Sequence, residues 1–388
     1  MNSSVMNTYG RYDLSFASGE GAYIVATDGR RFLDFGSGIA VTSLGHCHPH
    51  LVKTLQDQAA TLWHCSNLYS IPNQDRLAQR LVENSFADRV FFANSGAEAV
   101  EAGLKMVRKY HDDNGNPEKY RVISCENSFH GRTMATISAG GQEKHLMGFS
   151  PIVEGFDHVR FGNLNEMRAA VTKETAAILV EPVQGEGGIY PAPENYLKSL
   201  REIADEFGLL LFFDEVQTGI GRTGKLFAHE WAGVTPDIMS LAKGLGGGFP
   251  IGACLATEKA AALTPGSHGS TFGGNPLATA AGNAVLDIIL EDGFLDNVNQ
   301  STEKLMGRVN EIAAKHPKII ESVRGAGLLI GMKCVVPNSD LIGKLHDLGM
   351  LTVPAGDNIA RLIPPLIIGD KEIEEAAGMI EKACEELE

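Results

Sequence analysis

Short runs of apolar residues recur along the middle of the chain, and residues typical of turns bound each run. We expect six of them to be strands, covering residues 90–94, 121–125, 176–182, 209–215, 237–243 and 252–257. Polar and apolar positions do not alternate within them, which is typical of strands buried on both faces in a parallel sheet. The pattern therefore predicts an α/β fold with helices on both sides of the sheet.

Helical patterns lie between these runs. In residues 195–208 the apolar residues recur at the spacing of one helix face, and Gly208 is expected to end the helix. The residues predicted to be buried on this face are Leu197, Leu200, Ile203, Ala204 and Phe207. Together with the runs before and after it, this helix forms a βαβ unit.

The chain has 388 residues, which is too long for one compact core. From about residue 283 the pattern changes to long amphipathic helices and shorter strands. We predict a large domain over residues 60–282. Residues 1–59 and 283–388 are predicted to form a smaller α+β domain from both chain ends.

Composition and charge exclude several classes of protein. The formal net charge of -15 disfavours binding to nucleic acid and to anionic membranes. The apolar runs end after about five residues, far short of the roughly 20 that span a bilayer. The first residues lack a basic segment followed by an apolar one, and the six cysteines form no C-x-x-C pair. We expect a cytoplasmic protein with free thiols.

A glycine-rich loop follows the strand predicted at residues 209–215. Gly219, Gly221 and Gly224 match G-x-G-x-x-G, and the same segment approximates a phosphate loop. Leu226 stands where a phosphate loop needs Ser or Thr, and the first glycine comes five residues after Asp214. A nucleotide site is therefore not predicted here.

Residues that could bind a ligand or take part in catalysis lie at three strand ends. Asp214 and Gln217 follow one strand, and Lys243 ends the next, where open α/β sheets bind ligands. Ser95 and Glu98 match a capping box at a helix start, and Gly96 allows a ligand to approach the backbone. Taken singly, Lys243 reads as a lysine reaching solvent and Ser95 as an ordinary cap.

Together, these strand ends offer an anion site, a carboxylate and an amine. Pyridoxal phosphate needs these three groups, for its phosphate, its ring nitrogen and its aldehyde respectively. The carboxylate raises the pKa of the ring nitrogen and so favours the protonated ring. The residues therefore indicate a site for pyridoxal 5'-phosphate.

Longer motifs carry a resemblance over most of the chain, from about residue 21 to 368. They are GHCHP, NSGAEA, FHGRT, EPVQGEGG, FDEVQTGIGRTG, AKGLGGGFPIGA, HGSTFGGNP and RLIPPLI. The chain resembles the class III, fold-type I aminotransferases that use pyridoxal phosphate, and within them the acetylornithine aminotransferases. The resemblance implies a mostly parallel seven-stranded sheet in the large domain. It also implies transfer of an ω-amine from N2-acetylornithine to 2-oxoglutarate in a ping-pong reaction of arginine biosynthesis.

The resemblance implies a role for each matching residue. Lys243 would bind the cofactor as a Schiff base and move the proton, and Asp214 would pair with the pyridine nitrogen. Phe129 and Val216 would cover the two ring faces. The remaining residues expected near the cofactor are Ser95, Gly96 and Ala97 at the phosphate, Gln217 near the phenolic oxygen, Glu181, and Thr271 of a second subunit. The active site would therefore be shared within a homodimer.

Two arginines would recognise the substrates, since a guanidinium binds carboxylates through two hydrogen bonds. Arg132 would hold the acetylated amino acid, and Arg361 the α-carboxylate of glutamate. Glu186 would pair with Arg361 when an ω-amine donor is bound and release it for glutamate. Ser270 would also reach the substrate. A lone arginine is more often a surface ion pair, and only its motif favours the substrate role here.

Two positions depart from related sequences. Ala97 stands where many relatives have Thr, so one hydroxyl contact to the phosphate is lost, at about 1 kcal/mol. Ile39 stands where enzymes acting on free ornithine have a tyrosine, and this apolar residue favours an acetylated amine. GHCHPH places three histidines near Cys47, but we predict no metal, because adjacent residues cannot easily all face one ion.

Three alternatives remain at this stage. The donor could be ornithine, 4-aminobutyrate or succinyl-diaminopimelate on the same scaffold. An aminomutase on this fold would need no external keto acid. A binding protein without cofactor could retain the fold, although Lys243, Asp214 and the expected phosphate site argue against it.

Overall fold

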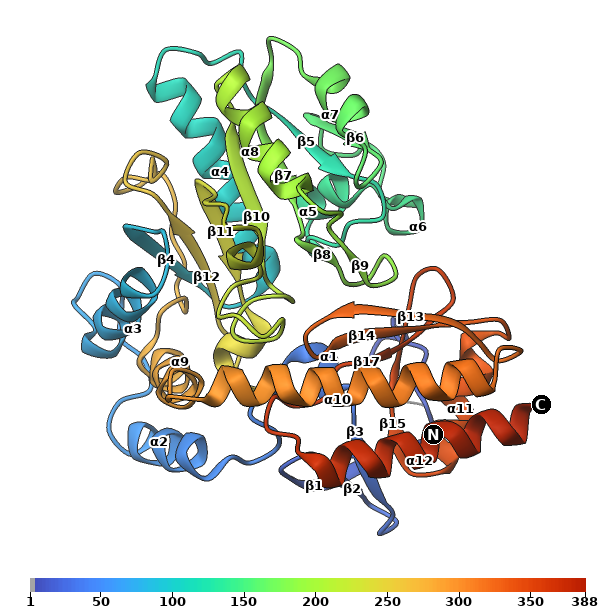
Figure 1. Cartoon of the computed structure of the whole chain (residues 1–388). Coiled ribbons are helices and arrows are strands. Elements are labelled where there is room, and N and C mark those ends of the chain that lie inside the picture. The colour runs from blue at the N-terminus through green and yellow to red at the C-terminus, as the bar shows by residue number, and fades with distance from the viewer. Residues whose placement is uncertain (1–3) are drawn as a thin grey trace.

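The computed structural model describes residues 4–388, and its largest sheet has seven strands (Figure 1). Their spatial order is β4-β12-β11-β10-β7-β5-β6. The strands are β4 (Arg89–Ala93), β5 (Arg121–Cys125), β6 (Phe156–Val159), β7 (Thr175–Val180), β10 (Leu210–Asp214), β11 (Ile238–Leu241) and β12 (Gly252–Ala256). Only β12 runs antiparallel to its neighbours within this sheet. The predicted mostly parallel seven-stranded sheet is confirmed.

The six predicted strands all overlap strands of this sheet, and β6 is the one that the pattern missed. Its sequence, FDHV, has two polar residues between two apolar ones, so it contains no continuous apolar run. It lies at the edge of the sheet, and only Val159 in it is buried. An edge strand needs fewer apolar residues than a central one, which explains the omission.

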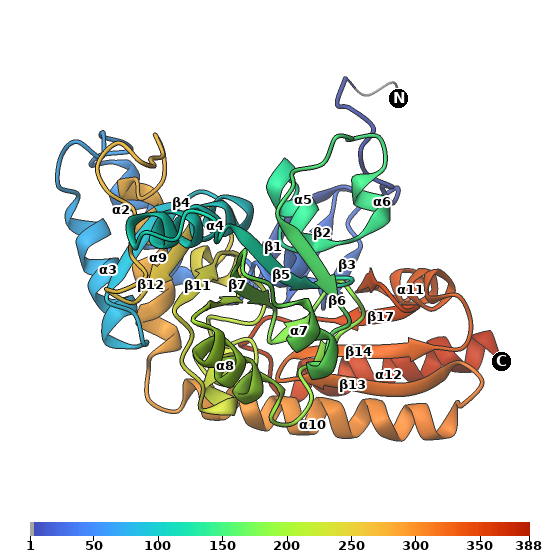
Figure 2. The same ribbon diagram turned by 90° about the horizontal axis from the view of Figure 1, so that it is seen from above.

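Helices cover both faces of the sheet (Figures 1 and 2). They include α4 (Gly96–Asp113), α5 (Met134–Gly140), α7 (Leu164–Ala170) and α8 (Tyr196–Phe207). Phe212 of β10 packs in the same apolar cluster as Leu104 of α4. Its neighbours Leu211 and Phe213 pack in the cluster that contains Leu200 of α8. Successive residues of β10 therefore pack on opposite faces of the sheet, because side chains alternate in direction along a strand.

The helix predicted from residues 195–208 is α8, and Gly208 ends it with a left-handed φ of 62°. Leu197, Leu200, Ile203 and Ala204 are buried as predicted. The prediction for Phe207 is wrong, because this side chain is 38% exposed. It is the last helical residue, where the helix leaves the sheet and the apolar face has no partner to cover it.

Both chain ends contribute to a second group of elements, shown in blue and red in Figure 1. One sheet has the order β1-β2-β3-β15 and the other β13-β14-β17-β16. These strands are β1 (Phe16–Glu20), β2 (Tyr23–Ala26), β3 (Arg31–Asp34), β13 (Ile320–Ala326), β14 (Leu329–Cys334), β15 (Met350–Leu351), β16 (Val353–Ala355) and β17 (Ile359–Leu362). Strands β3 and β15 pair in parallel and join the two chain ends. The domain boundaries at residues 59 and 282 remain a prediction.

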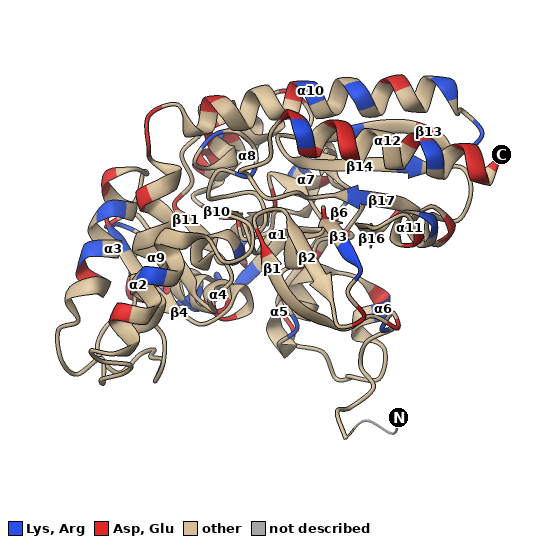
Figure 3. Ribbon diagram, turned by 90° about the horizontal axis from the view of Figure 1, so that it is seen from below, with Lys and Arg blue, Asp and Glu red and all other residues tan. Residues whose placement is uncertain are grey.

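Three helices accompany these strands, namely α10 (Phe294–Lys315), α11 (Asn338–Asp347) and α12 (Asp370–Leu387). Residues of both charges lie along α10 and α12, as Figure 3 shows. The ion pairs Lys304–Asp370, Arg308–Glu374 and Lys315–Glu381 join the two helices along their length. Exposed pairs of this kind contribute little each, so the buried apolar residues between the helices supply most of the stability.

The remaining elements are short or lie beside the large sheet. They are α1 (Ser37–Ala40), α2 (Pro49–Ala59), α3 (Pro72–Glu83), α6 (Glu143–Leu146), β8 (Val183–Gln184), β9 (Tyr190–Pro191), the 3-10 helices η1 (Ala228–Ala232) and η2 (Lys243–Gly246), and α9 (Pro276–Ile289). Pro49 begins α2, at a position where proline is favoured. All six cysteines are free. No helix within residues 4–388 is long and apolar enough to cross a membrane.

The loop with the nucleotide-like glycines connects β10 to η1. Gly221 and Gly224 both have a φ of +86°. A Cβ on Gly224 would lie 1.9 Å from Oδ1 of Asn299, which donates through Nδ2 to the Gly224 carbonyl at 3.0 Å. At Gly224 the glycine therefore lets the loop pack closely against α10, which accounts for this part of the pattern.

Candidate active site

A cavity of about 420 Å³ lies where the parallel strands of the large sheet end. Strands β4, β7, β10 and β11 point their carboxyl ends at it, and each has a polar residue that lines the cavity at its end or within two residues beyond it. These four residues are Ser95, Glu181, Asp214 and Lys243. The structure thus brings together residues that the sequence separates by almost 150 positions, at the edge where open α/β sheets bind ligands.

Asp214 is the last residue of β10 and is 3% exposed. Its Oδ1 accepts hydrogen bonds from the backbone N–H of Val216 at 3.0 Å and the hydroxyl of Ser240 at 3.1 Å. Its Oδ2 lies 2.7 Å from Nδ1 of His130. A buried carboxylate is costly unless donors replace the water it has lost, and these three partners do so here.

His130 is the cation in this arrangement, and sequence reasoning did not select it. Burial alone would lower the pKa of His130, but the hydrogen bond and charge of Asp214, with the charge of Glu181, raise it. Its Nε2 is buried and has no hydrogen-bond partner among residues 4–388. One nitrogen therefore serves Asp214, while the other remains a free polar group beside the cavity.

Lys243 lies two residues beyond β11 and begins η2. Its φ is +43°, a left-handed value that is uncommon for any residue other than glycine. Such strained backbone clusters at functional sites. Burial lowers the pKa of Lys243 and the charge of Arg361 adds to this, whereas Glu186, Asp214 and Glu181 oppose it. A lowered pKa makes the amine a better nucleophile near neutral pH.

The start of α4 is where the sequence predicts an anion site. Ser95 is the N-cap, and its hydroxyl accepts from the N–H of Glu98 at 3.3 Å. The other half of the predicted capping box is wrong, because the Glu98 carboxylate accepts from the N–H of Asn94 at 2.7 Å and the hydroxyl of Ser95 at 3.1 Å, and not from the N–H of Ser95. Gly96 and Ala97 line the cavity beside the positive end of the helix dipole.

Gly96 is also required by the close approach of the neighbouring strand end. A Cβ at this position would lie 2.8 Å from Cγ1 of Val216, so a larger residue would displace Val216 into the cavity. Gly131 approaches Ala97 in the same way, because an added Cβ would lie 2.6 Å from the Cβ of Ala97. The segments that carry Gly96, Gly131 and Val216 therefore pack so closely around the start of α4 that neither glycine leaves room for a side chain.

Glu181 lies 5% exposed below the cavity. Its two carboxylate oxygens accept from the N–H of Phe129 at 2.9 Å and of Gly185 at 3.3 Å. Burial raises the pKa of Glu181 to about 7, the charge of His130 lowers it, and that of Asp214 raises it. This carboxyl group can therefore carry or release a proton near neutral pH.

Arg361 and Glu186 lie in contact, although 175 residues separate them in the chain. Nη1 of Arg361 donates to Oε1 of Glu186 at 2.6 Å and to Oε1 of Gln217 at 3.3 Å. Arg361 is 1% exposed, and its Nε has no partner among the described residues. Burial opposes the charge on Glu186, but Arg361 and Lys243 outweigh burial and lower the pKa of Glu186.

Of the other predicted residues, three line the cavity and two lie outside it. Phe129, Arg132 and Val216 line it, and the guanidinium of Arg132 lies 5.4 Å from the centre of the Phe129 ring. Ser270 does not line it, but its hydroxyl accepts from Asn94 at 3.2 Å near the start of α4. Thr271 is exposed outside this cavity.

Several residues around the cavity were not selected from the sequence. Among them are His130, Ser240 and Val41, the last of which lines the cavity where Ile39 was expected. Ile39 is 39% exposed. A signal existed for His130, which lies directly after Phe129 in FHGRT. Ser240 is the only polar residue inside the apolar run of β11, and a buried hydroxyl usually marks a partner.

These residues fit pyridoxal phosphate. A helix start can bind its phosphate, the carboxylate of Asp214 can face a protonated ring nitrogen, and Lys243 can reach its aldehyde from the same cavity. Among residues 4–388 there is no group of three or more His, Cys, Asp or Glu side chains that could hold a metal ion. His46 instead pairs with Asp34 at 2.8 Å, and His50 with Asp287 at 2.9 Å.

Comparison with known proteins agrees with this assignment. The model of the family "Aminotransferase class-III" matches residues 6–384. The acetylornithine aminotransferase of Mesorhizobium japonicum is 58% identical over 386 residues, covering 99% of this chain and 97% of that protein.

Two solved structures share the fold over nearly the whole chain. The N-acetylornithine aminotransferase of Stenotrophomonas maltophilia K279a has a TM-score of 0.85 and 36% identity, covering 98% of this chain and 97% of its own. The ornithine aminotransferase of Toxoplasma gondii, described with partial occupancy of PLP at its active site, has a TM-score of 0.94 and 32% identity. That match covers 98% of this chain and 92% of the Toxoplasma chain.

The His130–Asp214 pair predicts a pH-dependent stability. Because the pKa of His130 is raised in the folded protein, the pair stabilises fully below the unfolded value of about 6.5 and less as pH rises through the folded value. We expect His130→Gln to lower the free energy of unfolding of the cofactor-free protein by about 3 kcal/mol at pH 6, and by less at pH 9. Urea denaturation at both pH values measures the difference.

His111→Gln is the matched control with the opposite sign. His111 is also buried and lies 2.9 Å from the carbonyl of Ala176, but burial lowers its pKa. Removing it should therefore destabilise the protein less at pH 6 than at pH 9. Equal pH dependence of the two variants would contradict a charged His130.

Proposed function

The chain belongs to the class-III aminotransferase family and is a pyridoxal-phosphate-dependent transaminase, and we propose that its amino donor is N2-acetyl-L-ornithine. The ω-amine passes to 2-oxoglutarate, giving N-acetyl-L-glutamate 5-semialdehyde and L-glutamate in arginine biosynthesis. The observation that carries the substrate is the 58% identity, over 99% of the chain, to a protein named acetylornithine aminotransferase. The cavity supports the chemistry.

Lys243 is the proposed attachment point, through a Schiff base to the aldehyde of the cofactor. Its position at the end of β11 and its lowered pKa support this role. Once released by substrate, the same amine can take the proton from the reacting carbon and return it. The cofactor, when bound, supplies the electron sink for that carbon.

Asp214 is proposed to hold the proton of the pyridine nitrogen, since its carboxylate is buried and fixed by three donors. Ser95, Gly96 and Ala97 at the start of α4 bind the phosphate. The remaining proposed contacts follow the lining of the cavity. Phe129 and Val216 would exclude water from the two faces of the cofactor ring. Gln217 would lie toward its phenolic oxygen, and Glu181 would lie near the cofactor.

Substrate recognition is assigned to two cationic sites. Arg132 is exposed at the rim and can receive the carboxylate of acetylornithine, with Ser270 nearby. Arg361 is covered by Glu186 and can receive the α-carboxylate of glutamate only when Glu186 moves away. One cavity would then accept both acetylornithine and glutamate, which differ in charge at the end that faces Arg361. Amine transfer in two steps requires this, because both donors react in the same cavity.

A homodimer is the proposed assembly. Large apolar side chains are exposed around residues 62–69 and 272, including Trp63 at 65%, Leu68 at 88% and Phe272 at 60%. These segments lie together, because Asn67 donates to the carbonyls of Ser270 at 3.0 Å and Gly273 at 2.9 Å. An exposed apolar surface of this kind suits a second copy, whose active site Thr271 would complete.

Reaction with single amino donors tests the substrate. We expect N2-acetylornithine to bleach the yellow absorbance of the cofactor-loaded protein at least tenfold faster than ornithine or 4-aminobutyrate, measured by stopped-flow absorbance without keto acid. Lys243→Ala, purified in the same way, should show neither the absorbance of the bound Schiff base nor bleaching.

Other outcomes of this panel discriminate the alternatives. Comparable bleaching by N-succinyl-diaminopimelate would add a second substrate, and faster bleaching by ornithine or 4-aminobutyrate would replace the proposed one. Multiple turnovers without 2-oxoglutarate would indicate an aminomutase. A protein that stays colourless with pyridoxal phosphate would refute the cofactor assignment for this chain.

Arg361→Ala tests the division of labour between the arginines. Its loss should slow the half-reaction with glutamate by about 100-fold, since a buried charged hydrogen-bonded contact contributes about 1.5–3 kcal/mol and Glu186 is left uncompensated. The half-reaction with acetylornithine should slow by less than tenfold. Equal losses in both half-reactions, measured by single-turnover absorbance, would contradict the proposed pairing of Arg361 with glutamate.

In the proposed dimer, a charge introduced at Phe272 should disturb only the contact between the two subunits. Phe272→Glu is expected to shift the protein toward monomer in sedimentation equilibrium, because it places a charge in an apolar contact. Val335→Glu, at a side chain that is 55% exposed elsewhere, should leave the mass unchanged. A wild-type protein that sediments as a monomer would refute the shared active site.

A further inference from the structure

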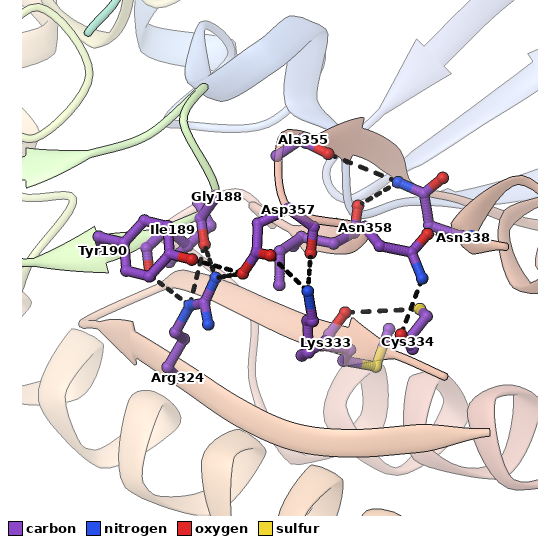
Figure 4. Close-up of polar contacts among 12 residues, drawn as sticks. Gly188, Ile189, Tyr190, Arg324, Lys333, Cys334, Asn338, Ala355, Asp357 and Asn358 are labelled. Carbon is purple, nitrogen blue, oxygen red and sulfur yellow. Dashed lines mark hydrogen bonds and ion pairs between the residues drawn. The ribbon is translucent and has the colours of Figure 1, made fainter. Parts of the chain in front are cut away.

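A second cluster of charged residues lies outside the cavity, around Asp357 (Figure 4). Asp357 is in the turn between β16 and β17. Its Oδ2 accepts from Nη2 of Arg324 at 2.6 Å and from the hydroxyl of Tyr190, and its Oδ1 pairs with Lys333. Lys333 also donates to the backbone carbonyl of Asp357 at 2.7 Å. One carboxylate thus joins three donors from β9, β13 and β14.

The turn that carries Asp357 is fixed to the small sheet. Asp357 and Asn358 have left-handed φ values of 55° and 54°. The side chain of Asn358 donates to the carbonyls of Cys334 at 2.7 Å and Val336 at 2.8 Å, and accepts from the N–H of Asn338 at 2.8 Å. The positive φ at both residues is therefore maintained by bonds to the end of β14, and the turn is a fixed point.

Arg324 connects this fixed point to the loop between β8 and β9. Its Nε donates to the carbonyls of Gly188 at 3.0 Å and Ile189 at 3.1 Å, and its Nη2 to Gly188 at 2.7 Å. Its guanidinium also lies 3.9 Å from the centre of the Tyr190 ring. Asp357 orients this guanidinium, so the carboxylate reaches the loop both through Arg324 and through the Tyr190 hydroxyl.

The backbones of loop and turn are in direct contact as well. The N–H of Gly356 donates to the carbonyl of Glu186 at 2.8 Å. A Cβ on Gly188 would lie 3.0 Å from the Cβ of Asp357, and a Cβ on Gly356 would lie 2.7 Å from the carbonyl oxygen of Gly187. The loop that presents Glu186 is therefore seated against the Asp357 turn with no room for another side chain.

The same turn leads into the strand that presents Arg361. Arg361 lies on β17, four residues after Asp357, and it contacts Glu186 at 2.6 Å. The cluster thus fixes the elements that carry both members of this ion pair relative to each other. We propose that Asp357 is a positioning residue, which holds the Glu186 loop against β17 and thereby sets how firmly Glu186 covers Arg361.

This inference rests on the proposed function, since Arg361 is assigned there to the α-carboxylate of glutamate. Burial opposes the charge on Asp357, but hydrogen bonds from Arg324, Lys333 and Tyr190 hold its pKa well below the ordinary range. The cluster therefore keeps its charge at physiological pH and acts as a permanent anchor. Weakening it should let Glu186 leave Arg361 more readily and favour glutamate over the ω-amine donor.

Hydrogen–deuterium exchange of the cofactor-free protein tests the anchoring directly. Asp357→Asn keeps the shape of the side chain and removes its charge, and it should raise exchange in peptides covering residues 185–191 at least threefold. Asp157→Asn is the matched control, because Asp157 binds Arg121 at 2.6 Å with 28% of its side chain exposed, against 31% for Asp357. Unchanged exchange in the loop, or a rise across the whole chain, would overturn the proposal.

Half-reaction kinetics of the cofactor-loaded protein test the consequence. In Asp357→Asn the rate constant ratio of glutamate to acetylornithine should rise at least threefold, and in Asp157→Asn it should stay within twofold of wild type. In a Glu186→Gln background Asp357→Asn should change the ratio no further, because it acts through Glu186. Additive effects of the two substitutions would overturn the mechanism.

Failure of the proposed function and failure of the proposed anchoring by Asp357 give different results. A wild-type protein that does not react with acetylornithine would overturn the proposed function. The exchange experiment needs no substrate and would still decide whether Asp357 anchors the loop.

Discussion

The cavity is arranged around the buried carboxylate of Asp214. A charge removed from water at the end of an apolar strand is costly unless donors surround it, and the chain supplies these from three segments. His130 comes from the segment after β5, Ser240 from β11, and the N–H of Val216 from the turn after β10 itself. Satisfying one carboxylate therefore ties together the segments at the ends of β5, β10 and β11. The positions of Lys243 and the α4 start follow from the same sheet edge.

Much of this arrangement was accessible from the sequence because it is local. A buried strand followed by a polar residue predicts where Asp214 and Lys243 lie, and a serine before a helix predicts the anion site. His130 was not selected, since its partner is 84 residues away and its place after Phe129 in FHGRT does not identify Asp214 as that partner. The contact of Glu186 with Arg361 was expected from a family resemblance, because 175 residues of chain carry no local signal for it. Phe207 was misjudged because periodicity specifies a helix face but not where its cover ends.

Charge balance inside the cavity explains how so acidic a chain can serve anionic substrates. Glu181, Glu186 and Asp214 lie near Lys243, Arg361 and His130, so carboxylates and cations are matched within the site despite a net charge of -15 overall. Burial lowers the pKa of Lys243 and raises that of Glu181 to about 7, so both groups become less charged than they would be in water. Glu181 can therefore exchange a proton near neutral pH, whereas the planar guanidinium of Arg361 suits carboxylate binding.

The glycines around Glu186 determine what kind of movement can uncover Arg361. They provide close approach as well as backbone freedom, because a Cβ on Gly185 would lie 1.9 Å from Oε1 of Gln217 and one on Gly187 would lie 2.8 Å from the Asn127 carbonyl. The backbone of a loop that is packed this closely on both sides cannot move without breaking these contacts. The Glu186 side chain, 26% exposed, can rotate on this fixed backbone at much lower cost. On the proposed function, the exchange between substrates is then a competition between two carboxylates for one guanidinium, and the firmness of the backbone beneath Glu186 decides which of them prevails.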